Sequence, residues 1–373
     1  MKGLAITSKG IEHIAALEVK EMLGKDSTLY DGCITFDVSA IEQLITFTYM
    51  TQSSERVLLL LDHIELGKID SLNSLDFKKW VDKKTFRITV DHIDSDHDLV
   101  VEEIIEQVAE IILSKTKAKV DLDHPDIVFY VYISKKNVFF GIDLCRFELQ
   151  KRQYRIFPHQ AALRSTLGYA LVRIAGYKKN LTLLDPFCGS GTIPIEAVLY
   201  ALKFPVNYFN KDKFIFHTLG KFDSFLATID KKIIKEDVNI YGYDSFMGCV
   251  IGARKNAKIA GIDKFIAFSR VEISWLDTKF KKGSVDLIVT QPPEPSKTKN
   301  DKDIEKLYKD FFYQAEYILK KKGKIVTITR NNLLLKKHAE PFAFHLKEEL
   351  SVFSGKQEMV ISVFVHNNSK HNS

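Results

Sequence analysis

The chain has 373 residues, of which 45% are hydrophobic and 27% are charged, and its formal net charge is +6. This length and composition predict two or three domains with sizeable cores and exclude a largely disordered protein. No apolar run reaches the roughly 18 residues that suggest a membrane-spanning helix, and Glu12 and His13 interrupt the stretch that a signal peptide would need. The four cysteines are scattered without a C-x-x-C pair, which predicts a reducing, cytoplasmic environment and no metal site.

The first 150 residues alternate between short strands and amphipathic helices. In chain order we predict a strand at 4–7, a helix at 10–22, a strand at 33–38, a helix at 41–51, strands at 56–61 and 86–90, a helix at 100–114, and strands at 126–134 and 138–144. This order indicates an α+β architecture.

The C-terminal part contains a longer series of apolar strands. We predict a helix at 160–174, then strands at 182–184, 239–243, 266–270, 285–289, 324–328, 350–353 and 359–365. Strands that alternate with helical segments indicate a Rossmann-like, doubly wound α/β sheet.

The charge is unevenly distributed between these two parts. Residues 1–150 carry a net charge of −9, whereas residues 151–373 carry +15. A basic C-terminal part favours a polyanionic partner, because phosphate neutralisation supplies most of the affinity in nucleic-acid binding. In the acidic part, local groups such as Lys83, Lys84 and Arg87 are candidates for such contacts, and a solvated surface explains them equally well.

The segment 183–196, LLDPFCGSGTIPIE, contains the clearest ligand-binding pattern. A buried strand ends at Asp185, a turn of small residues runs to Thr192, and a helix follows, so backbone N–H groups can approach a ligand closely. The turn lacks the lysine of a P-loop, and Pro194 stands where a dinucleotide fingerprint needs its third glycine. An acid followed by G-x-G favours S-adenosylmethionine, with a plain βα turn as the alternative.

Three segments carry a resemblance to a known family. DPFCGSGTIPIEA resembles the cofactor loop of the THUMP-domain RNA methyltransferases, LQKRQYRIFPHQAALRSTLGYALV is similar to their junction between THUMP and catalytic domains, and NIYGYDSFMGCVIGARKNAKIAGI is similar to their second cofactor motif. The resemblance extends over about residues 3–365. Within the family, the tRNA guanine-N2 methyltransferases are the most similar, followed by the ribosomal-RNA guanine-N2 enzymes.

The resemblance implies a domain organisation. It predicts a ferredoxin-like domain at 1–65, a THUMP domain at 66–150, a linker with a basic segment and a helix at 151–179, a class I methyltransferase domain at 180–365 and a disordered tail at 366–373. The aromatic segment 204–225 resembles a family insertion, and we expect it to pack beside the catalytic cleft. The last two strands resemble the antiparallel pair that closes methyltransferase sheets.

The resemblance also implies binding residues. Asp185 is expected near the charged methionyl group of the cofactor, Asp244 at its ribose hydroxyls and Asp277 at its adenine. The predicted cofactor-binding set, with core packing as the alternative for Trp275, is Asp185, Phe187, Gly189, Ser190, Gly191, Thr192, Asp244, Ser245, Trp275, Asp277 and Gln291. The predicted RNA-binding set in the linker is Lys151, Arg152, Tyr154 and Arg155, with core packing as the alternative for Tyr154.

The fourth motif departs from the family pattern N/D-P-P-Y/F, because this chain reads Q-P-P-E. In the family, a side-chain oxygen and a proline-region carbonyl orient the target amino group, and an aromatic ring stacks on the base. We therefore predict Gln291 and the Pro292 carbonyl as acceptors for a guanine amino group. Glu294 cannot stack, which forgoes about 1–3 kcal/mol, and we expect it to accept from guanine N1–H instead.

Three functions stay open at this point. The first is a tRNA guanine-N2 methyltransferase that forms N2-methylguanosine at position 6 of the acceptor stem. The second is a methyltransferase for ribosomal RNA or another base. The third is an RNA-binding protein with a methyltransferase fold and lost or altered catalysis. We expect a cytoplasmic monomer without metal or membrane contact, in which residues 1–150 choose the RNA and residues 180–365 perform the chemistry.

Overall fold

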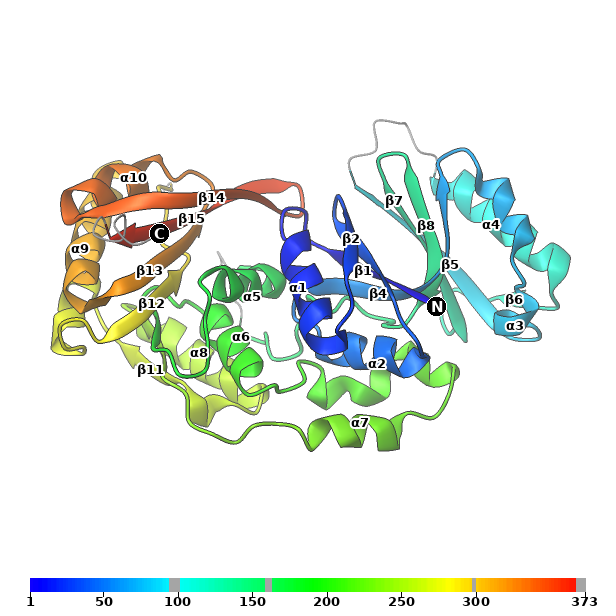
Figure 1. Ribbon diagram of the computed structural model, residues 1–373, viewed down its shortest axis with the longest axis horizontal. Helices are drawn as coiled ribbons and strands as arrows, with labels where there is room; N and C mark the ends of the chain where they lie inside the picture. Colours follow the sequence, from blue (N-terminus) through cyan, green and yellow to red (C-terminus); the bar gives the residue numbers. More distant parts are fainter. Residues whose placement is uncertain (94–100, 158–162, 297–299, 367–373) are drawn as a thin grey trace. The chain divides into compact units, whose positions relative to one another are not determined.

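The computed structural model describes residues 1–93, 101–157, 163–296 and 300–366 (Figure 1). The chain forms two compact units, each built from two separate stretches. The first unit consists of Met1–Leu149 and Asn207–Lys231, and the second of Gln150–Val206 and Lys232–Ser373. The chain therefore leaves the second unit once, at residue 206, and returns to it at residue 232.

The first unit is built on one eight-stranded sheet. Its elements are β1 (Lys2–Thr7), α1 (Glu12–Leu23), β2 (Ser27–Tyr30), β3 (Cys33–Asp37), α2 (Ile41–Met50), β4 (Ser54–Glu65), η1 (Ile69–Ser74), α3 (Lys78–Val81), β5 (Thr85–Ile93), α4 (Val101–Lys115), β6 (Lys119–Val120), β7 (Ile127–Ser134), β8 (Asn137–Asp143), η2 (Tyr208–Lys213), η3 (Ile215–Thr218) and α7 (Asp223–Asp230). The strand order is β2-β3-β1-β4-β8-β7-β5-β6. Because β4 pairs with both β1 and β8, one continuous sheet includes strands from both sides of residue 65. The boundary between a ferredoxin-like domain at 1–65 and a THUMP domain at 66–150 stays a prediction.

The aromatic segment 204–225 does not lie where we expected it. Phe214, Phe216 and Phe222 belong to the hydrophobic core of the first unit, and the Phe214 ring lies 5.0 Å from that of Phe147. Just after this segment, Asp230 at the end of α7 accepts a hydrogen bond from the Tyr49 hydroxyl of α2 at 2.7 Å. The expectation of packing beside the catalytic cleft is therefore wrong, because these rings gain their burial in the N-terminal core.

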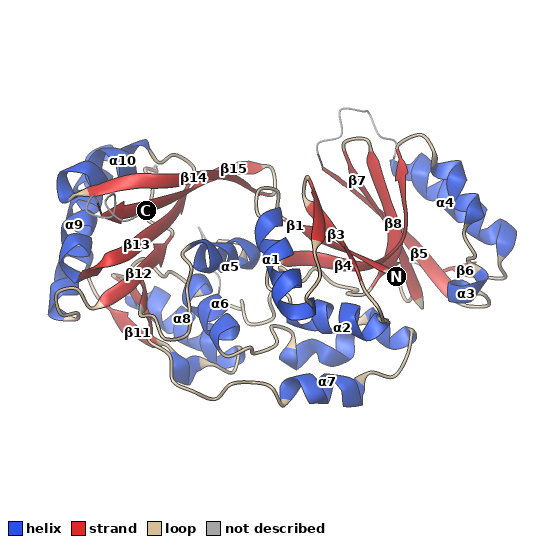
Figure 2. Ribbon diagram, in the orientation of Figure 1, coloured by secondary structure: helices blue, strands red, loops and turns tan. Residues whose placement is uncertain are grey.

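The second unit contains a seven-stranded sheet with helices on both faces. Its elements are α5 (Ser165–Ile174), β9 (Leu183–Asp185), α6 (Thr192–Ala201), β10 (Ile240–Asp244), α8 (Met247–Ile259), η4 (Asp263–Phe265), β11 (Ala267–Arg270), η5 (Ile273–Thr278), β12 (Val285–Thr290), α9 (Asp301–Ile318), β13 (Leu319–Thr329), α10 (Leu333–Ala339), η6 (Glu340–Phe342), β14 (Phe344–Ser354) and β15 (Gln357–His366). Figure 2 shows α5, α6 and α8 on one face of the sheet and α9 and α10 on the other. The predicted helix at 160–174 is observed as Ser165–Ile174 with Arg164 as its N-cap, and residues 160–162 lie outside the described residues.

The strand order places the carboxyl ends of five parallel strands at one edge of the sheet. The order is β11-β10-β9-β12-β13-β15-β14. β9 is central, since Leu183 pairs with Ile240 on one side and Leu287 on the other, both in parallel register. β15 runs antiparallel to β13 and β14, as predicted for the last two strands. Such a sheet collects ligands beyond the carboxyl ends of its parallel strands.

Candidate functional site

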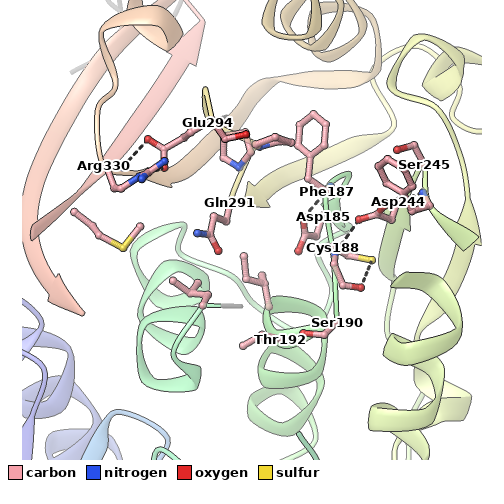
Figure 3. Close-up of a pocket in the computed structure, with 18 of the residues that line it drawn as sticks. Asp185, Phe187, Cys188, Ser190, Thr192, Asp244, Ser245, Gln291, Glu294 and Arg330 are labelled. Atoms are coloured by element: carbon pink, nitrogen blue, oxygen red, sulfur yellow. Dashed lines mark hydrogen bonds and ion pairs between the residues drawn. The ribbon is translucent and has the colours of Figure 1, made fainter. Parts of the chain in front are cut away.

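A cavity of about 650 Å³ lies beyond the carboxyl ends of β9, β10, β12 and β13 (Figure 3). Asp185 ends β9 and Asp244 ends β10, while Gln291 follows β12 and Arg330 follows β13. All four residues line the cavity. The sheet topology thus brings together side chains that lie up to 145 positions apart in the sequence.

The Gly-rich turn forms the floor of this cavity. Gly191 has φ +84°, and a Cβ there would lie 3.0 Å from the Cβ of Ala253 and 3.2 Å from the ring of Phe268. Only glycine fits this position, because the backbone is left-handed and α8 and β11 lie close against it. α6 begins at Thr192 without a side-chain cap. The first amides of α6 are therefore available to a ligand in the cavity.

Asp185 is a buried acid at the centre of the sheet edge. It is 1% exposed, and its Oδ1 accepts from the Thr290 hydroxyl at 2.6 Å and the Phe187 N–H at 3.2 Å. Burial raises the pKa of Asp185 to about 7, and the negative charge of Asp244 acts in the same direction. A cationic ligand would favour the ionised form of this carboxyl group.

The Asp244 carboxylate binds the turns that follow β9 and β10. Its Oδ2 accepts the Gly189 N–H at 3.0 Å, and its Oδ1 accepts the Phe246 N–H at 2.9 Å. These bonds fix the orientation of the carboxylate and leave each oxygen a lone pair for a hydroxyl donor of a ligand. The exposed ring of Phe246 adds an apolar wall to the same cavity.

The loop after β12 carries the fourth motif. The Tyr308 hydroxyl of α9 donates to the Pro293 carbonyl at 2.7 Å, which fixes the loop. Gln291 is half-buried and has no hydrogen-bond partner among the described residues. In Figure 3 its side chain lies between Asp185 and Arg330. The Gln291 amide is thus free to contact a substrate in the cavity.

Glu294 has partners that the sequence analysis did not foresee. Its Oε1 accepts the backbone N–H groups of Arg330 at 2.9 Å and Asn331 at 3.2 Å, and its Oε2 accepts Arg330 Nε at 3.1 Å. Its side chain is 11% exposed. Both carboxylate oxygens of Glu294 are therefore engaged within the chain.

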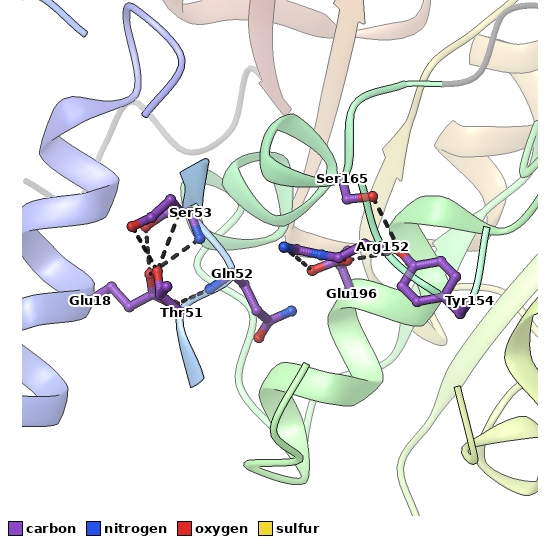
Figure 4. Close-up of polar contacts among 9 residues, drawn as sticks. Glu18, Thr51, Gln52, Ser53, Arg152, Tyr154, Ser165 and Glu196 are labelled. Atoms are coloured by element: carbon purple, nitrogen blue, oxygen red, sulfur yellow. Dashed lines mark hydrogen bonds and ion pairs between the residues drawn. The ribbon is translucent and has the colours of Figure 1, made fainter. Parts of the chain in front are cut away.

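The structure contradicts the predicted RNA contact for two linker residues. The Arg152 side chain is fully buried, and its Nε donates to Glu196 at 2.9 Å. Tyr154 is also buried, and its hydroxyl donates to the same carboxylate at 2.8 Å (Figure 4). These residues attach the linker to α6, so the alternative of core packing holds for Tyr154. Lys151 is exposed and Arg155 is half-buried, and RNA contact stays a prediction for them.

Two predicted cofactor-binding side chains lie outside the cavity lining. Trp275 and Asp277 are on η5 and both are exposed, Trp275 by 61%. The Asp277 N–H donates to Gln314 of α9 at 2.9 Å. Neither side chain lines the cavity, and cofactor contact stays a prediction for both. The other predicted positions line the cavity, except Gly191, which lies in the turn between two that do: Asp185, Phe187, Gly189, Ser190, Thr192, Asp244, Ser245 and Gln291.

Other residues at this site were not predicted from the sequence. Phe246 follows a predicted strand-end acid by two positions, and Arg330 follows a predicted strand whose carboxyl end lies at the same edge. Strand-end position was thus an available signal for both. Ser354, Gln357 and Met359 reach the cavity from the hairpin between β14 and β15, which no motif indicated. In the part of the chain that the structure describes, no group of three His, Cys, Asp or Glu could hold a metal, and no helix is long and apolar enough to cross a membrane.

Comparisons with known proteins agree with this architecture. Residues 152–359 match the RMKL-like methyltransferase domain, and residues 70–143 match the THUMP domain. The tRNA (guanine(6)-N2)-methyltransferase of Methanocaldococcus jannaschii is 29% identical, over 93% of this chain and 95% of that protein. The corresponding protein of Archaeoglobus fulgidus is 27% identical, over 97% and 91%. The ribosomal RNA large subunit methyltransferase K/L of Aliivibrio salmonicida is 26% identical, over 84% of this chain and 47% of that protein.

Solved structures share the fold over nearly the whole chain. SMU.472 complexed with SAH has a TM-score of 0.81 at 19% identity and covers 98% of both chains. TrmN from Thermus thermophilus has a TM-score of 0.73 at 22% identity, covering 98% of this chain and 99% of the other. The predicted combination of an α+β THUMP region and a class I methyltransferase sheet is confirmed.

Proposed function

The chain belongs to the RMKL-like methyltransferase domain family, and we propose that it transfers the methyl group of S-adenosylmethionine to N2 of a guanine in tRNA. The observation that carries the proposal is the meeting of the Gly-rich turn, Asp185, Asp244 and Gln291 in one cavity. Full-length similarity to two proteins named tRNA (guanine(6)-N2)-methyltransferase supports position 6 as the target.

The residues of the cavity fit this cofactor. The first amides of α6 have no side-chain cap and are available to it, and Asp185 would be stabilised in its ionised form by the cationic methionyl end. Asp244 keeps acceptor capacity for both ribose hydroxyls. When bound, the cofactor supplies an electrophilic methyl group.

Gln291 and the Pro292 carbonyl orient the target amino group. The lone pair of the guanine amino nitrogen is delocalised into the ring, so the nitrogen is a poor nucleophile. Gln291 Oε1 accepts one N2–H and the Pro292 carbonyl the other, which directs the lone pair toward the cofactor side of the cavity. Neither acceptor is basic near neutral pH, so the role of both is to position the amino group.

The first unit binds the RNA in this proposal. Its THUMP match supports this role, and the charge of +15 on residues 151–373, most of which belong to the second unit, favours the approach of a polyanion to the catalytic unit. The target base must leave its helix to enter the cavity, which costs a few kcal/mol. Lys151 and Arg155 are the linker side chains that we propose for backbone contacts, because Arg152 and Tyr154 are buried.

Methyl transfer to defined RNAs tests the proposal. Purified protein and tritiated S-adenosylmethionine are incubated with tRNA transcripts that carry guanosine or adenosine at position 6, and nucleosides are identified by mass spectrometry. We expect N2-methylguanosine from the guanosine transcript alone. The K/L relatives favour ribosomal RNA as a second candidate, so a large-subunit rRNA transcript is the comparison substrate. A folded, cofactor-binding protein that methylates neither RNA would contradict the proposal.

A further inference from the structure

Glu294 and Arg330 form a fixed pair at the rim of the cavity. Glu294 binds Arg330 twice, at its backbone N–H and at Nε, and also binds the next backbone N–H, that of Asn331. The pair links the loop after β12 to the turn after β13, 36 positions later. Both residues line the cavity, and Figure 3 shows the Arg330 side chain turned toward the Glu294 carboxylate.

This geometry makes Glu294 a poor reader of the target base. Its two oxygens already accept three hydrogen bonds, and its side chain is largely buried. Only one lone-pair site of the carboxylate stays open, on Oε2, and it lies beside the Arg330 guanidinium that this oxygen already holds. The charge-assisted contact with Arg330 directs the carboxylate toward that residue. The acid at the fourth place of the motif therefore acts on Arg330.

Arg330 keeps its terminal edge available. Only Nε of its guanidinium has a partner among the described residues, and its side chain is 51% exposed. The two terminal nitrogens carry N–H donors in a planar fork that matches two acceptors on one edge of a base. Because Glu294 holds Nε, the direction of this fork is fixed before a ligand arrives.

We propose that Arg330 identifies the target base as guanine by donating to its O6 and N7, and that Glu294 positions Arg330 for this contact. In Figure 3, Gln291 lies between Arg330 and Asp185. A guanine whose amino group faces Gln291 and the cofactor side turns its opposite edge, with O6 and N7, toward Arg330. Adenine presents an amino donor in place of O6, which the donor fork of Arg330 rejects. The inference rests on the proposed function and names the specificity residue of the same site.

The proposal also accounts for the altered motif. The family's aromatic residue holds the base by stacking, and Glu294 cannot do so. A bidentate arginine contact to guanine supplies discrimination of about 10-fold to 100-fold, which is the same order of magnitude as a lost stacking contact. In this chain, hydrogen bonds to the edge of the base therefore take the place of the family's stacking on its face.

Substrates with single altered atoms test the contact. Three tRNAs are assembled by ligation with guanosine, 7-deazaguanosine or 2-aminopurine at position 6. All three keep the N2 amino group; 7-deazaguanosine lacks only the N7 acceptor, whereas 2-aminopurine lacks O6 and the N1–H. We expect the wild-type kcat/KM to fall about 10-fold with 7-deazaguanosine. A Glu294 contact to N1–H predicts instead full activity with 7-deazaguanosine and a loss confined to 2-aminopurine.

Variants connect the altered atom to the residue. Arg330→Ala should react slowly with guanosine and show less than a twofold further loss with 7-deazaguanosine, because the partner of N7 is already absent. Arg330→Lys keeps the charge without the fork and should recover little of the discrimination. Glu294→Gln weakens the hold on Arg330 and should reduce the guanosine preference by an intermediate amount. Lys282→Ala removes a charge in the turn before β12, at the other end of that strand from Gln291, and should match the wild type.

The outcomes distinguish a failure of the proposed Arg330 contact from a failure of the proposed function. A wild type that methylates guanosine and 7-deazaguanosine equally overturns the role of Arg330 and leaves the proposed function standing. The role of Arg330 is also overturned if Arg330→Ala lowers kcat/KM by the same factor on guanosine and on 7-deazaguanosine. That result indicates that Arg330 contacts the RNA elsewhere, and it leaves the proposed function standing. A wild type inactive on every guanosine substrate overturns the proposed function and this inference with it. Calorimetric cofactor binding and thermal melting of each variant show that the protein is folded.

Discussion

Asp244 Oδ2 accepts the backbone N–H of Gly189 at 3.0 Å, so the acid at the end of β10 holds the turn that follows β9. Its Oδ1 accepts the Phe246 N–H and so holds the turn between β10 and α8. One carboxylate therefore shapes the turn and, in the proposed function, accepts the ribose hydroxyls. Removal of Asp244 should affect both properties.

Replacement of Asp244 should weaken S-adenosylmethionine binding in a graded way. Asp244→Asn keeps one acceptor oxygen but presents an N–H₂ group to the second backbone donor, so we expect a loss of about 10-fold. Asp244→Ala removes both acceptors and should cost about 100-fold, since each lost bond to a charged group is worth roughly 1.5–3 kcal/mol. Isothermal titration calorimetry measures both. Equal affinity of the two variants would contradict the assigned role.

The raised pKa of Asp185 predicts a pH dependence of cofactor binding. With a pKa of about 7, the group gains its negative charge between pH 6 and 8. The ionised form attracts the cationic end of the cofactor, so affinity should rise with pH across this range. In Asp185→Asn this rise should disappear, while the side-chain oxygen still accepts from Thr290. A wild-type affinity that is constant from pH 6 to 8 would contradict this charge interaction.

The same shift makes Asp185 a source of instability in the unliganded protein. Its folded pKa of about 7 lies above the ordinary value of 3.8, so the folded state binds more protons than the unfolded state between these pH values. The contribution of Asp185 to the free energy of unfolding therefore decreases as pH rises from about 4 to about 7. Asp185→Asn should raise the melting temperature at pH 8 relative to the wild type, although it weakens cofactor binding. Differential scanning calorimetry without ligand measures the shift.

The strand ends of the site could be predicted from the sequence, because a buried strand followed by an acid or a glycine turn is a local pattern. Asp185, Gly191 and Asp244 were found in this way, whereas Gln291 was assigned from the resemblance of Q-P-P-E to the family's fourth motif. Trp275 was also assigned through the family resemblance, and the structure exposes it on η5. Local patterns give the position of a residue along a strand, but they do not give the direction of its side chain.

Contacts between distant residues could not be predicted. Arg152 and Tyr154 occur in a basic segment typical of RNA binding, and their partner Glu196 lies about 40 positions later, inside the cofactor motif. Glu294 likewise finds Arg330 only when β12 and β13 pair. A single sequence contains the charges of such pairs and lacks the information on which charges become buried together.

The buried Arg152–Glu196 pair should be important for stability. Both side chains are fully buried, and removal of one partner leaves an uncompensated charge. Arg152→Ala and Glu196→Ala should each lower the free energy of unfolding by about 3–5 kcal/mol. Replacement of both by apolar residues of similar size, Arg152→Met with Glu196→Leu, should recover most of this loss. Urea denaturation measures all three, and single variants as stable as the wild type would show that the pair contributes little.

The exposed part of the same linker should affect RNA binding without this loss of stability. Lys151→Glu with Arg155→Glu leaves the buried pair intact and reverses two charges that we propose to face phosphates. The change should lower tRNA affinity and reduce the slope of log affinity against log salt by about 1 to 2, because each neutralised phosphate contributes somewhat less than 1 to that slope. Lys281→Glu with Lys282→Glu makes the same change in net charge in the turn before β12 and is the matched control. Filter binding of labelled tRNA at several salt concentrations measures both slopes. If the two double variants lose affinity equally, the effect belongs to the net charge of the protein, and the linker does not contact the RNA.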